Sequence, residues 1–425
     1  MIKFNDNNEI IENESYRAIL VGVYKDEDIS YSMEELKGLA LAVNAQVLGM
    51  MTQKILKANP RTLIGSGKVL ELKEMVENME ADTVIFNDEL TGVELRNLEE
   101  ELGVHVIDRT ILILDIFARR AVTREGKLQV ELAQLKYRLP RLVGFGKSLS
   151  RLGGGIGTRG PGETKLEVDR RHIEKRIDDI KKELDSLKSV RDTKKKKREK
   201  NEIPVVSLVG YTNAGKSALM NRMLHLNNKE DKLVFEENML FATLDTSERK
   251  ISLDSNHEII LIDTVGFVSR LPHSLVEAFK STLENVKYSD ILIQVIDSTY
   301  DECDFQIEVT NKVLKEIGAG DKEKILAYNK CDVSSYIPSP SNCPQISISA
   351  KENINIDKLV EMVKESVFKD EIRATLLIPF SKGDVVSYLM EKANIISTKY
   401  TENGTLIEGI FLNKEYMKYK EYEVI

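Results

Sequence analysis

The sequence predicts an α/β chain of several domains: a small parallel βα subdomain, a long antiparallel helical hairpin, a domain with a mostly parallel sheet, and a small α+β domain. First, its 425 residues are too many for one ordinary hydrophobic core. Second, short apolar runs alternate with helical patterns before residue 120, and this alternation resumes at Ile203. Third, a long helical periodicity separates the two regions. We place the domains at residues 1–122, 123–200, 201–369 and 370–425.

The first domain is predicted from short apolar runs and helical patterns in alternation. Candidate strands lie at Ala18–Tyr24, Thr83–Phe86 and Val104–Ile107. Candidate helices lie at Ser32–Asn44, Ser66–Glu80, Gly92–Leu102 and Thr110–Ala121. The tetrapeptide Gly65–Lys68 (GSGK) lacks the spacing to a second glycine and the following Ser or Thr of a phosphate-binding loop. We interpret it as the start of a helix.

The second domain contains two helical patterns, Gly126–Arg138 and Glu163–Lys200, which flank Gly153–Gly162. This flanked segment holds six glycines and a proline, so no helix continues through it. A floppy turn is one interpretation. Two helices can reverse within a few residues, however, so the extra length, with Arg151 and Arg159, favours a loop that orders against a partner.

Charge is distributed unevenly along the chain. The formal net charge is −8, which alone argues against a nucleic-acid partner. From Lys136 to Arg176, however, 11 Lys and Arg stand against 4 Asp and Glu, and Arg191–Lys200 holds 7 against 2. A solvated helix face would explain either stretch, and a linker would also explain the second. A polyanion bound through counterion release is the functional alternative.

The sequence also limits where the protein acts. The segment MIKFNDNNEIIENES is acidic and polar and lacks the pattern of a secretory signal. No apolar run approaches the roughly 20 residues needed to cross a bilayer. Cys303, Cys331 and Cys343 have no paired spacing, which argues against a disulfide framework or a zinc site. We expect a soluble cytoplasmic monomer without stable membrane insertion; peripheral membrane association is the alternative.

The third and fourth domains follow at Ile203. Candidate strands of the third domain lie at Val205–Val209, Glu258–Ile262, Ile291–Ile296, Lys324–Ala327 and Gln345–Ile348. The last domain follows the order strand, helix, strand, strand, at Ala374–Pro379, Lys382–Ala393, Ile395–Tyr400 and Leu406–Leu412. It contains no recognisable chemistry.

A phosphate-binding loop joins the strand Val205–Val209 to a helical stretch, ALMNRML. The loop consists of Gly210, Tyr211, Thr212, Asn213, Ala214, Gly215, Lys216 and Ser217. Its glycines let backbone N–H groups converge on phosphate oxygens, and the helix N-terminus adds a favourable dipole. We expect Lys216 to meet the β- and γ-phosphates and Ser217 to bind Mg²⁺.

Two more motifs follow strands in the order that a guanine-nucleotide site requires. The first consists of Asp263, Thr264, Val265 and Gly266. We expect Asp263 to hold Mg²⁺ through water and the Gly266 N–H to meet the γ-phosphate. The second consists of Asn329, Lys330, Cys331 and Asp332. A carboxylate at Asp332 can accept the N1–H and the N2 amine of guanine, whereas beside adenine a buried Asp332 would be unpaired.

The remaining contacts complete the predicted GTP site. Ser349, Ala350 and Lys351 would reach the guanine O6 through backbone N–H groups. The segment Phe241, Ala242, Thr243, Leu244 and Asp245 contains Thr243, our candidate for completing the Mg²⁺ shell, with Thr246 as the alternative. The catalytic contributions are assigned to Lys216, Thr243 and Gly266. Phe267 stands where many switch GTPases have a water-orienting Gln, which predicts slow hydrolysis assisted by another loop, a cation or a partner. Asn213 makes K⁺ a further candidate cofactor.

With these residues in view, the chain resembles the HflX-type GTPases over nearly its full length. The resemblance rests on Ile107–Leu142 and on Ser150–Ile173 (SRLGGGIGTRGPGETKLEVDRRHI) ahead of the nucleotide motifs. Within the third domain, GYTNAGKS, LFATLD and DTVGFVSRLPHSLVEAFKSTLE are also similar to that family. Two departures are TSER after Asp245, where the family often has Pro-Thr, and the basic run Lys194–Lys197.

The resemblance implies a two-part N-terminal region ahead of a P-loop GTPase domain. It implies binding to the large ribosomal subunit, its rRNA and proteins, with the Gly153–Gly162 loop directed toward the peptidyl-transferase region. It further implies ribosome splitting or rescue under stress, and a secondary ATPase activity, for which residues 1–200 contain no second phosphate-loop motif.

Two functions from different classes are therefore compatible with the sequence. The first is a ribosome-dependent GTPase in which GTP orders Thr243 and Asp263–Gly266 and thereby favours docking. The second is a nucleotide-switched regulator of a protein target at the membrane surface, where the basic stretches would meet acidic protein or lipid.

Overall fold

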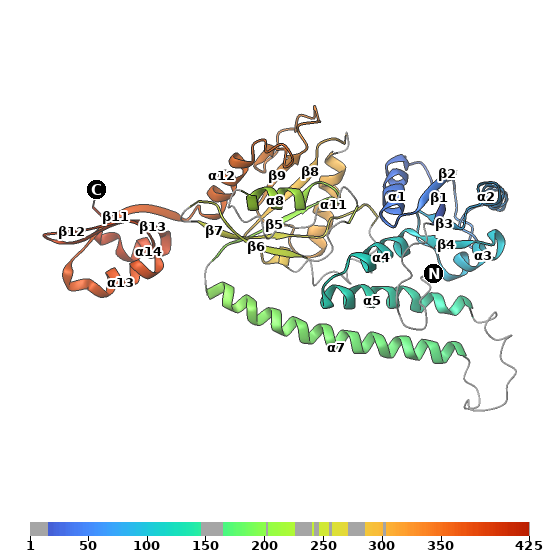
Figure 1. Ribbon diagram of the computed structural model, residues 1–425, viewed down its shortest axis with the longest axis horizontal. Helices are drawn as coiled ribbons and strands as arrows, with labels where there is room; N and C mark the ends of the chain where they lie inside the picture. Colours follow the sequence, from blue (N-terminus) through green and yellow to red (C-terminus); the bar gives the residue numbers. More distant parts are fainter. Residues whose placement is uncertain are drawn as a thin grey trace.

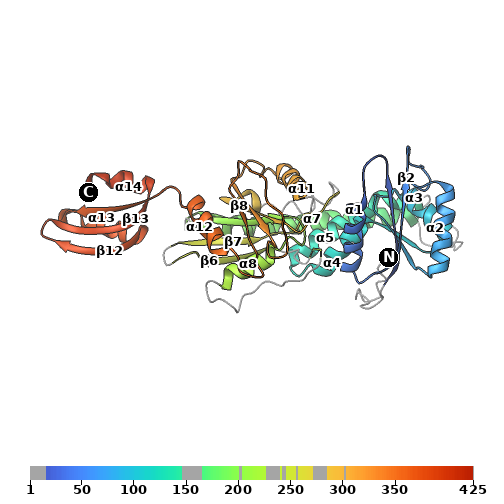
Figure 2. The same ribbon diagram turned by 90° about the horizontal axis from the view of Figure 1, so that it is seen from above.

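A computed structural model describes residues 16–145, 165–200, 203–225, 240–241, 246–254, 257–270, 285–300 and 303–424. The molecule is elongated, with the N-terminal subdomain at one end, the C-terminal domain at the other and the largest sheet between them (Figure 1, Figure 2). In Figure 1, the long helix α7 (Lys165–Lys200) runs below the largest sheet and below the helix α5 (Arg124–Arg138). The α/β fold class predicted from the sequence is confirmed.

The N-terminal subdomain is a parallel sheet with helices between its strands. Its elements are β1 (Arg17–Tyr24), α1 (Ser30–Ala42), β2 (Gln46–Lys54), α2 (Ser66–Met79), β3 (Thr83–Phe86), α3 (Gly92–Leu102), β4 (His105–Asp108) and α4 (Arg109–Arg120). The strand order is β2-β1-β3-β4, and every neighbouring pair is parallel. Helix α2 begins at Ser66 with Gly65 as its N-cap, so the interpretation of Gly65–Lys68 as a helix start is confirmed.

Strand β2 was not predicted. It is an edge strand whose side chains are mostly exposed or half-buried, and Met51 alone of its residues is buried. Gly49 interrupts the strand, and no run of β-branched residues marks it. It forms because β1 offers a partner along its whole length, from Arg17 to Tyr24.

The helical hairpin packs against this subdomain. It consists of α5 (Arg124–Arg138), the short 3₁₀ helix η1 (Leu139–Phe145) and α7 (Lys165–Lys200). Its apolar seam contains Leu128, Leu132, Ile177 and Ile180, at the helical spacing that the sequence predicts. The glycine-rich segment Gly153–Gly162 lies outside the described residues, so its conformation stays a prediction.

The third domain places its motifs at the carboxyl ends of parallel strands. Its elements are β5 (Val205–Gly210), α8 (Lys216–His225), β6 (Ser247–Ser252), β7 (Glu258–Asp263), β8 (Ile291–Asp297), α11 (Cys303–Glu316), β9 (Lys324–Asn329), β10 (Gln345–Ser347) and α12 (Ile356–Val367). The strand order is β10-β9-β8-β5-β7-β6. Strand β6, which was not predicted, is an antiparallel edge strand paired with β7, and all its residues are polar except the buried Ile251.

The C-terminal domain follows the predicted order of strand, helix, strand, strand. Its elements are β11 (Glu371–Ile378), η4 (Phe380–Lys382), α13 (Gly383–Lys392), β12 (Asn394–Thr401), β13 (Gly404–Leu412), α14 (Asn413–Tyr419) and η5 (Lys420–Tyr422). The three strands form an antiparallel sheet in the order β11-β13-β12. Helix α14 was not predicted; it covers the core through Tyr416.

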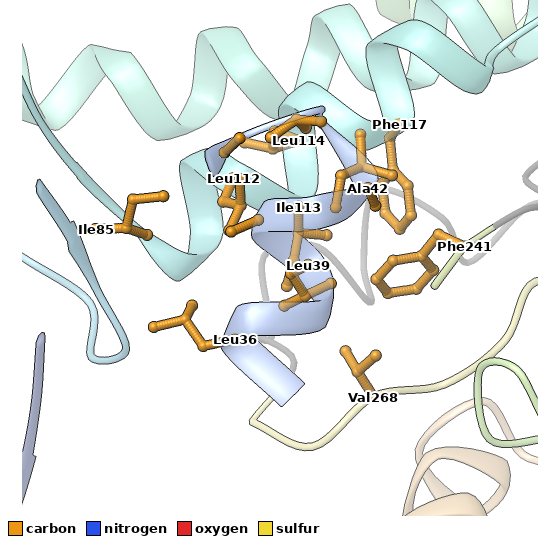
Figure 3. Packing of buried hydrophobic residues seen from close by; sticks show 14 of the residues in the cluster. Leu36, Leu39, Ala42, Ile85, Leu112, Ile113, Leu114, Phe117, Phe241 and Val268 are labelled. Atoms are coloured by element: carbon orange, nitrogen blue, oxygen red, sulfur yellow. The ribbon is translucent and has the colours of Figure 1, made fainter. Parts of the chain in front are cut away.

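The core of the N-terminal subdomain extends into the third domain. Phe241, Val265 and Val268 are buried in the same apolar cluster as Leu39 and Phe117 (Figure 3). The rings of Phe117 and Phe241 meet edge to face, with centroids 4.7 Å apart. Phe241 and the segment Val265–Val268, which belong to the predicted nucleotide site or border it, are therefore anchored in the N-terminal subdomain.

Candidate nucleotide-binding site

The loop Gly210–Ser217 connects the end of β5 to the start of α8. Gly210 and Gly215 have φ angles of 146° and 92°, which L side chains rarely adopt. A Cβ atom on Gly215 would lie 2.2 Å from Asn329 Nδ2, and one on Gly210 would lie 2.1 Å from the Val295 carbonyl oxygen. Glycine is therefore required at both positions, because residues of the neighbouring strands β8 and β9 leave no room for a side chain.

Lys216 is a buried cation inside this loop. Its Nζ donates to the carbonyl oxygens of Gly210 at 3.2 Å and Tyr211 at 2.8 Å. Burial lowers the pKa of Lys216 to about 8, and the nearby Asp263 carboxylate partly offsets this effect. Since a buried ammonium is stabilised by an anion, this environment fits phosphate binding by Lys216.

Ser217 and Asp263 bring together two oxygen atoms that could serve as metal ligands. The Ser217 hydroxyl donates to Asp263 Oδ2 at 2.6 Å, and Asp263 is fully buried at the end of β7. A hydroxyl and a carboxylate form the hard oxygen set that Mg²⁺ prefers, so these residues fit the ion. Ala242, Thr243, Leu244 and Asp245 lie outside the described residues, and the role of Thr243 stays a prediction. Thr246 directly precedes β6.

The segment after β7 crosses the phosphate-binding loop. The Phe267 N–H donates to the Gly210 carbonyl oxygen at 3.1 Å, and the Thr212 N–H donates to the Phe267 carbonyl oxygen at 2.7 Å. A Cβ atom on Gly266 would lie 2.6 Å from Thr212 Cα and 3.0 Å from Lys216 Nζ. Glycine is thus the residue that lets this backbone approach the loop.

The side chains of Thr264 and Phe267 contact the protein interior. The Thr264 hydroxyl donates to the Leu208 carbonyl oxygen at 2.6 Å. Phe267 is buried in an apolar cluster with Val209, Leu292 and Val313. Phe267 therefore contributes no polar group that could orient water, in agreement with the inference from residue type.

Asn329 joins three of the predicted motifs. Its Nδ2 donates to the Ala214 carbonyl oxygen at 2.9 Å, and its Oδ1 accepts from the Ala350 N–H at 3.0 Å. The Ser349 N–H donates to the Ile354 carbonyl oxygen at 3.1 Å. Two of the N–H groups predicted to meet guanine O6 thus have protein partners, and such a contact would require an exchange of hydrogen bonds.

Lys330 and Asp332 stand at the rim of the site. Lys330 adopts a φ of 67°, and its ammonium donates to Asp297 Oδ2 at 2.6 Å. Asp332 is exposed, so the burial that its base-reading role requires would have to come from the bound base. Lys351 is also exposed, with its ammonium 3.8 Å from Glu352. Asp297 was not among the predicted site residues. It is the last residue of β8, as Asn329 is the last residue of β9, and this shared position at a strand end could have identified it.

A second group of residues was also missed by sequence reasoning. Glu35, Arg109 and Ser269 are buried next to Tyr211 and form one hydrogen-bonded network. They lie far apart in the sequence, and no local motif marks them.

The described residues also limit other kinds of site. No group of His, Cys, Asp and Glu side chains among them is arranged to hold a metal ion by itself. Likewise, none of the helices described combines the length and the apolar character that crossing a bilayer requires.

Three family models match successive parts of the chain. A model described as GTP-binding GTPase N-terminal matches residues 30–118, and one described as GTP-binding GTPase middle region matches residues 120–198. A third, described as 50S ribosome-binding GTPase, matches residues 205–330.

Curated relatives match almost the whole chain. GTPase HflX of Caldanaerobacter subterraneus subsp. tengcongensis is 50% identical over 401 residues, which cover 94% of this chain and 92% of that protein. GTPase HflX of Lacrimispora saccharolytica is 42% identical over 398 residues, which cover 92% and 93%. A crystal structure of a GTP-binding protein from Sulfolobus solfataricus in complex with GDP is 28% identical, with 83% of this chain and 99% of that chain covered and a TM-score of 0.45.

Proposed function

This chain belongs to the HflX family of GTPases, and on that premise we propose that it is a Mg²⁺-dependent GTPase that binds the large ribosomal subunit and acts in splitting or rescuing stalled ribosomes under stress. The chain hydrolyses GTP to GDP and phosphate, as its family and its GTPase domain indicate. The observation that carries the Mg²⁺ assignment is that Lys216 and Ser217, at the start of α8, meet Asp263 at the end of β7.

Each residue of the site then has a defined task. Lys216 and the backbone N–H groups of the loop bind the phosphates, and Ser217 and Asp263 would hold Mg²⁺. When bound, the ion offsets negative charge on the transferred phosphoryl group. The Gly266 N–H would meet the γ-phosphate and so sense its presence. Because the Phe267 side chain is buried elsewhere, the group that orients the attacking water would come from another loop, a cation or a partner.

Guanine selection is assigned to Asp332. Its carboxylate would accept the N1–H and the N2 amine, a pair of donors that adenine does not offer in that arrangement. Asn329 supports this contact indirectly, because it fixes the base-reading segment to Ala214 of the phosphate-binding loop.

The large subunit is favoured as the partner by two observations. The family model that matches residues 205–330 is described as a 50S ribosome-binding GTPase. The stretch from Lys136 to Arg176 carries a local excess of positive charge in an otherwise acidic chain, which suits contact with rRNA phosphates. The Gly153–Gly162 loop within that stretch is the proposed point of contact.

Cosedimentation with purified large subunits tests this proposal. We expect more protein in the pellet with a non-hydrolysable GTP analogue than with GDP, because the γ-phosphate would order the docking-competent state. An equal pellet with both nucleotides would contradict the switch, and no pellet with either would contradict the ribosome as partner.

The K⁺ hypothesis for Asn213 has a separate test. Asn213 adopts a φ of 59° within the phosphate-binding loop. Faster turnover in K⁺ buffer than in Na⁺ buffer would support it, and equal turnover would end it.

A further inference from the structure

A carboxylate of the N-terminal subdomain is buried beside the phosphate-binding loop. Glu35 lies on α1 and is 7% exposed, and Arg109 at the start of α4 is 2% exposed. The Arg109 guanidinium donates to Glu35 Oε2, and its other terminal nitrogen donates to Asn87 Oδ1 at 2.9 Å. The subdomain thus holds the Glu35 carboxylate in place by a buried ion pair of its own.

The other partners of Glu35 belong to the GTPase domain. The Tyr211 hydroxyl donates to Glu35 Oε1, and the Ser269 hydroxyl donates to Glu35 Oε2 at 2.5 Å. The Ser269 N–H donates to the Tyr211 hydroxyl oxygen at 2.6 Å. Arg109 Nη2 also donates to the Ser269 carbonyl oxygen at 3.1 Å. One carboxylate therefore connects a loop residue with the segment three residues beyond Gly266.

Burial makes these hydrogen bonds costly to lose. Tyr211 and Ser269 are each 4% exposed, so water cannot easily replace a lost partner. Burial and the nearby Glu35 carboxylate raise the pKa of the Tyr211 hydroxyl above its ordinary value, which keeps it a donor. The ion pair between Arg270 and Glu27 crosses the same domain boundary at 3.2 Å, but Glu27 is largely exposed.

The N-terminal subdomain contacts one part of the nucleotide site more directly than the other. The loop from Ala214 onward is held within the GTPase domain, by α8 and by the hydrogen bond from Asn329. The segment around Gly266 is held from both domains. The Phe267 backbone is bonded to the phosphate-binding loop. Val265 and Val268, however, are buried in the core of the N-terminal subdomain, and Ser269 is bonded to Glu35. The first part serves phosphates that GDP also has, and the second serves the γ-phosphate.

We propose that Glu35 is a positioning residue of the nucleotide site: through Tyr211 and Ser269 it places the Gly266 backbone for contact with the γ-phosphate. This inference rests on the proposed GTP site. It makes the N-terminal subdomain a structural part of the GTP-specific contact, while GDP binding depends on the GTPase domain. The contribution of Glu35 is thus selective between two nucleotides that differ by one phosphate.

The test uses the full-length protein without ribosomes. Dissociation constants are measured for a fluorescent GDP and a fluorescent non-hydrolysable GTP analogue, together with kcat for GTP, in Glu35→Gln and Tyr211→Phe. In Glu35→Gln we expect GDP affinity to change by less than about threefold, while analogue affinity and kcat fall about tenfold or more. In Tyr211→Phe we expect analogue affinity and kcat to fall by less, and to fall more than GDP affinity does. Glu27→Gln is the matched control, because it removes an exposed contact across the same boundary.

Three results would overturn the inference. Unchanged analogue affinity and kcat in both variants would show that Glu35 does not position the Gly266 backbone. An increased kcat would show that the Glu35 contacts slow hydrolysis instead. An equal loss of GDP and analogue affinity would indicate a general structural role. Tyr211→Phe keeps the Glu35–Arg109 ion pair, so it decides the matter if Glu35→Gln fails to fold. Wild-type protein that binds no analogue would refute the GTP site itself.

Discussion

The side-chain amide of Asn329 donates a hydrogen bond to the carbonyl oxygen of Ala214, across 2.9 Å, and so joins the base-reading segment to the phosphate-binding loop. The same side chain accepts from the Ala350 N–H. Asn329 and its partners Ala214 and Ala350 are all buried. Its removal therefore leaves a buried carbonyl and a buried N–H without a partner at the same time.

Asn329→Ala should weaken binding of both GDP and GTP. Loss of these buried hydrogen bonds costs about 1–3 kcal/mol, which corresponds to a rise of roughly 5- to 150-fold in the dissociation constants. Titration with fluorescent nucleotides measures this. Asn97→Ala, which removes a hydrogen bond on the exposed surface, is the control and should change neither constant. Equal affinities in wild type and Asn329→Ala would show that the connection is dispensable.

Asp332→Asn should change the base preference. The amide can no longer accept two donors from guanine, whereas xanthine presents an acceptor where guanine has its N2 amine. We expect GTP affinity to fall about tenfold or more and xanthosine triphosphate affinity to rise. Competition binding with both nucleotides measures the exchange. Unchanged GTP affinity would refute the assignment of Asp332 to the base.

Gly266→Ala should impair hydrolysis with little effect on GDP. The new methyl group would meet Thr212 Cα at 2.6 Å, so the segment would have to move away from the loop. Loss of a backbone donor to the transferred group predicts a fall in kcat of about a hundredfold. Gly67→Ala is the matched control, because a methyl group added at Gly67 would have no neighbouring atom within 4 Å. Single-turnover measurements compare the two variants, and equal rates would contradict the role of Gly266.

Asp115 should make the N-terminal subdomain less stable as pH rises. Burial raises the pKa of this half-buried carboxyl to about 6, with Arg119 opposing the shift. The folded state therefore binds the proton more tightly than the unfolded chain, and this stabilisation is lost as pH rises through about 6. Asp115→Asn should raise the free energy of unfolding by about 1–3 kcal/mol at pH 7.5, with a gain that shrinks toward pH 4.

Hydrogen exchange of the β1 amides measures that stability within the subdomain. Asp26→Asn, at a largely exposed carboxylate, should have little effect at either pH. The same stability of Asp115→Asn and wild type at pH 7.5 would contradict the shift.

A feature could be predicted from the sequence when residues close together in the chain determine it. The loop Gly210–Ser217 is set by contiguous residues with special backbone needs, so its position between β5 and α8 was predictable. Strands β2 and β6 were missed because they are edge strands whose side chains need not alternate. Their pairing depends on a neighbour that is already folded.

The network around Glu35 could not be predicted for a different reason. A charged residue within an amphipathic helix is expected to face solvent, and nothing near Glu35 in the sequence signals burial. Its partners Arg109 and Tyr211 are 74 and 176 positions away along the chain. Only the packing of the N-terminal subdomain against the GTPase domain brings them together.

Whether the large ribosomal subunit activates this GTPase is measured by GTP turnover with and without purified subunits. We expect slow turnover by the protein alone and an increase of about tenfold or more with saturating subunits, since Phe267 supplies no water-orienting group. A variant lacking residues 153–160 should keep the basal rate and lose this increase. Turnover that is unchanged by large subunits would contradict the large subunit as the activating partner, and full stimulation of the deletion variant would contradict the role of residues 153–160.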